Sequence, residues 1–138
     1  MKPDRENMER FNDLASQILV RLYEAFPYPV TLAPVEFVGE LEEGPNGRLP
    51  ERGEFCVETI ARLREWGVID GEPFQYGLIN ATLTRDGFRA LDAIPEALGG
   101  STTIGSRLKD AARAASADAR GTLIRSAMDE LSRLIAGG

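Results

Sequence analysis

The segment over residues 63–91, LREWGVIDGEPFQYGLINATLTRDGFRAL, constrains the fold more than any other stretch of the chain. Gly67 follows an apolar pattern of helical period, and such a glycine favours a left-handed helix end. Strand-like runs then open at residues 68–69 and continue over 76–83, and residues 70–73 are predicted to form the turn between them. The segment therefore predicts an antiparallel hairpin. Its inner face is predicted to carry Ile79, Ala81 and Leu83.

Helices are predicted on both sides of this hairpin, because apolar residues recur three and four positions apart. The first helix is predicted over about residues 4–26, with Met8 at the start of its inner stripe and Pro27 after its end. A short helix follows Pro34, and an irregular loop then covers residues 42–54. A third helix leads to Gly67. A fourth begins after Thr84, whose hydroxyl can accept the free amides of the first turn.

The order of helix, short strand, two helices and a hairpin that returns to a helix resembles a winged helix-turn-helix domain. Two stretches carry the resemblance: L-x-x-x-G-x-I in LREWGVI (63–69) and L-T-x-x-G-x-x-x-L in LTRDGFRAL (83–91). The resemblance covers residues 11–94 and points to the superfamily rather than to one member. The fold class is thus expected to be mainly α with a small β hairpin. A winged-helix domain is expected over 1–97 and a carboxy-terminal helical extension over 98–138, with a hinge at 98–102.

In winged-helix proteins that read DNA, the third helix lies in the major groove and the wing touches phosphates. The resemblance therefore makes the charge of these two surfaces informative. The turn over residues 70–75 carries two acids and no Lys or Arg. Phosphate neutralisation supplies most of the non-specific affinity for DNA, so an acidic surface would repel a duplex. The third helix is also mainly acidic at its predicted outward positions, which are Glu54, Glu58, Thr59, Arg62 and Glu65.

An acidic helix beside aromatic residues instead predicts a surface for a protein partner, since aromatic side chains dominate binding hot spots. The partner-binding candidates are Glu54, Glu58, Arg62, Glu65, Trp66, Phe74 and Tyr76. Two alternatives stand beside this interpretation. The charged residues can form a solvated ladder of ion pairs, because they lie three and four positions apart. Trp66 can instead close the core.

The carboxy-terminal segment has a net charge of +2 over residues 101–138 and carries two apolar helical stripes. The first includes Ala112 and Ala115, and a break is predicted at 116–121. The second predicts either a symmetric homodimer or packing back onto the first helix, and its arginines leave nucleic acid or an anionic membrane surface as further alternatives. The dimerisation candidates are Leu123, Ile124, Met128, Leu131, Leu134 and Ile135.

The chain has no histidine and one cysteine, which excludes zinc sites built on imidazole and thiolate as well as Ser-His-Asp and Cys-His catalysis. We expect Cys56 to be a small buried hydrophobe. No enzyme activity, cofactor or metal is predicted, because no two carboxylates show the coupling that catalysis needs. No run of about 18 apolar residues exists, and the charged amino terminus does not resemble a signal peptide. These features predict a cytoplasmic protein without a membrane partner.

The leading hypothesis is a non-enzymatic winged-helix module that acts through contacts with a protein partner or with a second copy of itself. The alternative is a dimeric transcriptional regulator that binds DNA through Arg48, Arg52 and Arg62 around the long loop. Its affinity for DNA would then fall steeply with salt. The sequence identifies neither the partner, an operator sequence nor a small-molecule effector.

Overall fold

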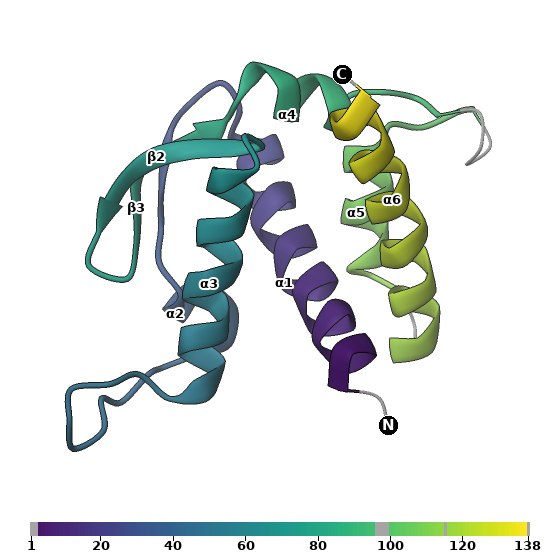
Figure 1. Ribbon diagram of the computed structural model, residues 1–138. Coiled ribbons are helices and arrows are strands. Elements are labelled where there is room, and N and C mark those ends of the chain that lie inside the picture. The colour runs from purple at the N-terminus through teal and green to yellow at the C-terminus, as the bar shows by residue number, and fades with distance from the viewer. Residues whose placement is uncertain (1–2, 96–99, 115, 138) are drawn as a thin grey trace.

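The computed structural model describes residues 3–95, 100–114 and 116–137, and within them it holds six helices and a small three-stranded antiparallel sheet (Figure 1). The predicted boundary between residues 97 and 98 and the predicted stripe position Ala115 lie outside the described residues. Most of the described chain is helical. The elements are α1 (Pro3–Ala25), β1 (Val30–Leu32), α2 (Val35–Val38), α3 (Glu51–Glu65), β2 (Ile69–Phe74), β3 (Gly77–Leu83), α4 (Arg85–Leu91), α5 (Ile104–Ala111) and α6 (Ala117–Gly137).

Helix α1 runs through the middle of the molecule, between α3 on one side and the pair α5 and α6 on the other (Figure 1). Its stripe of Leu14, Ile18 and Leu22 is buried, as the helical spacing predicts. Met8 is the exception, because its side chain is 65 % exposed. Its predicted place in the core is therefore wrong. The residue lines a groove between α1, α3 and α6.

The sheet has the strand order β1-β3-β2, so the short strand β1 joins the predicted hairpin. The predicted turn at 70–73 is wrong, because these residues belong to β2 and the chain reverses at Gln75 and Tyr76. Pro73 does not end the strand, since β2 is an edge strand, where a missing amide donor is tolerated. Gln75 takes a positive φ of 53°, which permits the tight reversal.

A bulge changes which side chains of β3 face the core. Asp70 pairs with Thr82 and Glu72 with Ile79, so β3 has one more residue than β2 in this interval. Asn80, with a φ of 53°, takes up the extra residue. As a result Leu78 is buried together with Ala81 and Leu83, and the predicted inner residue Ile79 is only half-buried.

The predicted helix boundaries on both sides of the hairpin are confirmed. Gly67 has a φ of 78°, and the amide of Val68 reaches back to the carbonyl of Leu63 at 3.1 Å. The hydroxyl of Thr84 accepts a hydrogen bond from the amide of Gly87 at 2.9 Å and so caps α4. Local chemistry therefore fixes where the hairpin enters and leaves the helical layer.

Helices α5 and α6 fold back onto α1, and their buried residues belong to the same core as those of α1 and the sheet. Ile124, Met128 and Leu131, which were predicted as dimer contacts, are buried inside the single chain and belong to its own core. The alternative, packing onto the first helix, is what the structure shows. Leu123 and Leu134 stay exposed and Ile135 is half-buried.

Two details of the carboxy-terminal helices differ from the sequence prediction. The predicted break at 116–121 ends earlier, because α6 begins at Ala117 and Ser116 accepts a hydrogen bond from the amide of Ala119 at 3.1 Å. Ala112 follows the end of α5 and is exposed, although it was predicted in the inner stripe. Among the residues that the structure describes, no helix combines the length and the hydropathy that crossing a membrane requires.

Candidate functional site

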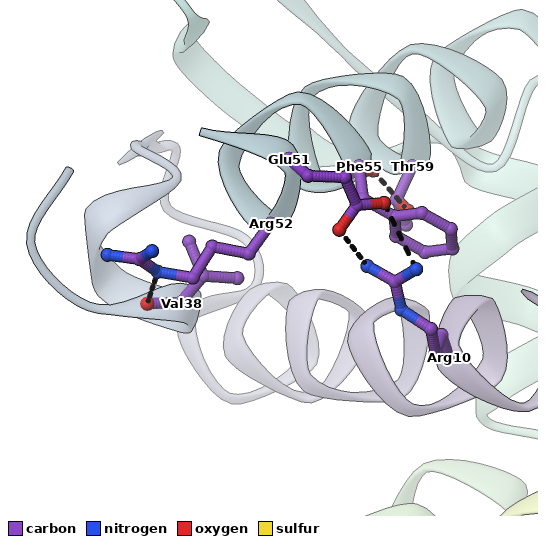
Figure 2. Close-up of polar contacts among 6 residues, drawn as sticks. All are labelled: Arg10, Val38, Glu51, Arg52, Phe55 and Thr59. Carbon is purple, nitrogen blue, oxygen red and sulfur yellow. Dashed lines mark hydrogen bonds and ion pairs between the residues drawn. The ribbon is translucent and has the colours of Figure 1, made fainter. Parts of the chain in front are cut away.

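The first turn of α3 is fastened to α1 and α2, and this sets the position of the predicted contact helix (Figure 2). Arg10 of α1 donates two hydrogen bonds to the carboxylate of Glu51, at 2.9 and 3.1 Å, and its guanidinium lies 3.9 Å from the ring centroid of Phe55. The hydrogen bond from Arg10 lowers the pKa of Glu51. Arg52 donates to the carbonyl of Val38, the last residue of α2, at 3.1 Å.

The sequence predicts Thr59 on the outward face of α3, but its side chain is buried. Because α3 packs against α1, α2 and the sheet, its buried face is wider than a single stripe. The hydroxyl of Thr59 donates to the carbonyl of Phe55 at 2.8 Å, which satisfies the polar group inside the core (Figure 2).

The remaining outward residues of α3 are exposed and form ion pairs, either with one another or with Arg48 of the preceding loop. Arg62 lies 3.4 Å from Glu58 and 3.5 Å from Glu65, and Glu54 lies 3.7 Å from Arg48. Exposed pairs of this kind contribute about 0–1 kcal/mol each, so they do not hold the fold together. Their effect here is on charge, because the guanidinium of Arg62 is shared between two carboxylates.

A groove of about 440 Å³ lies between α1, α3 and α6, and we call it the helical groove. Its walls are mainly apolar. The charged residues on its rim are Glu58 and Arg62 from α3 and Asp129 from α6. The apolar lining includes Met8, Phe11, Phe55, Trp66, Met128 and Ile135.

Trp66 stands at the carboxyl end of α3 and is 55 % exposed, so the alternative that it closes the core is wrong. Its ring meets that of Phe11 edge to face, with the centroids 5.4 Å apart and the planes at 63°. The same ring also lines a second hollow of about 440 Å³, with Arg89 of α4 and Leu134 of α6. Trp66 and Ile135 therefore line both hollows.

The wing aromatics Phe74 and Tyr76 do not join Trp66, although the sequence analysis grouped all three. They are exposed at the tip of the hairpin and line a different cavity of about 610 Å³, which we call the wing pocket. Its other walls come from β1 and from the loop over residues 39–50. The hydroxyl of Tyr76 donates to a carboxylate oxygen of Glu43 at 2.7 Å, and this bond raises the pKa of Tyr76.

The structure thus brings Glu58, Arg62 and Trp66 to the helical groove, where Met128, Leu131 and Ile135 line the opposite wall. Glu54 and Glu65 remain on the outward face of α3: Glu65 pairs with the rim residue Arg62, and Glu54 pairs with Arg48, which does not line the groove. Sequence reasoning missed Met8 and Asp129 as groove residues. For Met8, the only indication in the sequence was its place at the start of the α1 stripe. For Asp129 the sequence holds no indication, because its role depends on α6 lying beside α1.

The prediction for Cys56 is confirmed: the thiol is fully buried, and burial raises its pKa to about 11. A thiol of this pKa is protonated near neutral pH and is a poor nucleophile. Within residues 3–95, 100–114 and 116–137, no three Cys, Asp or Glu residues gather in a way that could hold a metal ion. Comparison of the chain with protein-family models, with curated proteins and with solved structures gives no match.

Proposed function

We propose that the protein is a non-enzymatic winged-helix module that acts through protein contacts, with the helical groove as its contact surface. The observation that carries this proposal is the half-exposed ring of Trp66 over an apolar groove beside an acidic helix. Tryptophan is among the residues most enriched in binding hot spots. Contiguous exposed apolar surface on a small domain is typical of an interaction site.

The winged-helix assignment is supported by the order of the elements. A helix, a short strand and two helices precede the hairpin, and β1 joins that hairpin in one antiparallel sheet. This is the order on which the resemblance in the sequence rests. Fold alone does not fix function, so the proposed activity depends on the groove and on the charges around it.

The partner that we propose is an amphipathic helix with Lys or Arg beside its apolar stripe. A groove walled by helices suits an apolar helical face, because anchors spaced three and four residues apart can fill it. The α3 side of the rim has Glu58 and the cation Arg62, which also pairs with Glu65 outside the groove, and the α6 side adds Asp129. Acids therefore outnumber cations, which favours a basic partner over an acidic one.

Contact with DNA through α3 is disfavoured because the arginines that would bind phosphates already have partners within the protein. Arg48 and Arg62 pair with carboxylates, and Arg52 donates to the backbone carbonyls of Val38 and Glu40. A duplex would have to displace these partners and then face Glu54 and Glu58. Counterion release could not offset this arrangement without more free cations.

Self-association through α6 would need Leu123, Leu134 or the groove itself, because the middle of the α6 stripe is buried within the chain. A second copy of the chain is therefore a competing occupant of the groove. Sedimentation of the isolated protein distinguishes the two occupants. A dimer that forms with rising concentration, and that Met8→Glu dissociates, would show that the groove binds a second copy of the chain instead of a basic helix.

The chain has one tryptophan, so its fluorescence reports directly on the groove. We would titrate the protein with two synthetic helices of about 18 residues, which share a leucine stripe and differ only in flanking Lys or Glu. The lysine peptide is expected to shift the emission of Trp66 and to bind at least about tenfold more tightly than the glutamate peptide. Met8→Glu should weaken binding, whereas Ile94→Glu, at another exposed apolar position, should not.

Equal affinity for the two peptides, or equal effects of the two variants, would contradict the proposed surface. A gel-shift assay with random genomic DNA at low salt tests the alternative function. Strong binding that Arg62→Gln abolishes, and that falls steeply as salt rises, would make the protein a DNA-binding regulator instead.

A further inference from the structure

The wing pocket is separate from the helical groove. A protein contact through the groove therefore leaves this pocket without a role. Its volume of about 610 Å³ lies within the range of small-molecule sites. Leu32 of β1 and Leu78 of β3 are buried beneath it, and Leu41 and Leu49 of the loop face it. The pocket therefore has an apolar floor and one apolar wall.

The opposite wall is aromatic. Phe74 ends β2 and Tyr76 lies in the turn that follows, and both line the pocket with much of their surface exposed. Aromatic faces attract organic cations through the ring quadrupole. Their rings thus offer contact both to an apolar body and to a positive charge.

The charge of the pocket has a single sign. Among the residues that the structure describes, its lining includes Glu40 and Glu43 and no Lys or Arg. The cations nearest in sequence are engaged elsewhere: Arg48 lies 3.7 Å from Glu54, and Arg52 donates to the carbonyls of Val38 and Glu40. An anionic ligand would meet two carboxylates here with no counter-charge, whereas a cationic ligand would be paired.

We propose that the wing pocket binds a small organic cation that carries an apolar body, such as an arylalkyl amine. The apolar body would lie against Leu32 and Leu78, and the ammonium group would lie between the wing aromatics and the two glutamates. Glu43 already accepts a hydrogen bond from the hydroxyl of Tyr76 at 2.7 Å, which holds the loop against the wing tip. An ammonium donor can share or replace that bond.

Three probes with the same body test this assignment: 4-phenylbutylamine, 4-phenylbutan-1-ol and 4-phenylbutyrate at pH 7. Amide shifts of the ¹⁵N-labelled full chain would give the affinities and locate the site. The amine is expected to bind with a dissociation constant of roughly 1 mM, as befits a ligand of this size. It should bind about tenfold more tightly than the alcohol, and the carboxylate should not bind measurably.

The charge-neutral variants separate this site from general electrostatic attraction. Glu43→Gln should lower the ratio of amine to alcohol affinity about threefold, and Glu40→Gln with Glu43→Gln should lower it further, to the preference of about two that the aromatic rings alone supply. Glu72→Gln is the matched control, because it removes the same charge from the wing at a residue that does not line the pocket and should leave the ratio unchanged. A ratio near one in the unaltered protein, a ratio that survives the double variant, or shifts confined to other residues would overturn the proposal. Trp66 emission should not respond to the amine, so the outcome is independent of the helical groove.

Discussion

The helical groove and the wing pocket are both apolar hollows with acidic rims, yet they are built differently. The groove lies between three helices of the core, and its rim includes the cation Arg62. The wing pocket lies under a hairpin tip and a long loop, and its lining has no cation within the part of the chain that the structure describes. Helical walls suit an extended apolar partner, whereas a pocket closed by a loop and two aromatic rings suits a small ligand. The sequence analysis grouped Trp66 with Phe74 and Tyr76, but the fold places Trp66 at the groove and the other two at the pocket.

The largest expected effect concerns the depth of the groove. Leu131 lines it but is only 2 % exposed, so Leu131→Asp places a charge in the core. We expect a loss of about 4 kcal/mol or more in the free energy of unfolding, measured by urea denaturation. Leu134→Asp, at a position that is 38 % exposed, is the control and should cost less than about 1 kcal/mol. Similar losses of unfolding free energy for both variants would mean that α6 does not pack as described. The groove would then not lie between helices of the core, and this contrast with the wing pocket would fail.

The second effect should disrupt the wing pocket and spare the groove. A Cβ on Gly77 would come within 1.9 Å of the backbone oxygen of Leu32, so Gly77→Ala must separate β3 from β1. We expect a loss of about 2–4 kcal/mol in thermal or urea unfolding. The pocket should no longer bind the amine, while the emission maximum of Trp66 stays unchanged below the transition.

Gly121 provides the matched control for this substitution. It lies within α6, and a Cβ there meets nothing within 4 Å. Gly121→Ala should therefore raise the free energy of unfolding by up to about 1 kcal/mol through helix propensity. If Gly77→Ala were equally harmless, the close approach of β1 to the wing would be refuted.

The smallest expected effect depends on pH and involves the Arg10 contact that fixes α3 beside the groove. The folded-state pKa of Glu51 lies below its ordinary value of 4.5, so its contribution is present above that value and is lost as pH falls through the folded pKa. Glu51→Gln should therefore lower the urea midpoint at pH 7, and the difference from wild type should vanish in acid. Glu54→Gln, which removes a longer ion pair of 3.7 Å, should give a smaller difference at pH 7.

Local chemistry explains which parts of the fold could be predicted from the sequence. The helix end at Gly67 and the cap at Thr84 depend on neighbouring backbone groups, and both predictions are confirmed. The position of the wing turn depends on strand order, because Pro73 is tolerated only on an edge. The bulge at Asn80 depends on pairing with β2, which periodicity alone cannot reveal.

The candidate site was predictable residue by residue but not as a whole. The sequence suggested Glu58, Arg62 and Trp66 as contact residues because of their type and spacing. Their meeting with Met128 and Ile135 requires α6 to fold back beside α1, a long-range contact that no local pattern specifies. The same apolar stripe of α6 was compatible with a partner copy or with the chain's own core, and only the packing decides between them.

The hydrogen bonds of Arg10 and Arg52 at the first turn of α3 also affect how the sequence of this protein could evolve. Because the helix start is secured from both α1 and α2, extra residues near Pro45 would lengthen the loop without displacing α3. The entropic cost of a longer loop grows only slowly with its length. The wall of the wing pocket could thus be remodelled by insertion, and ligand preference there could diverge while the other hollow kept its shape.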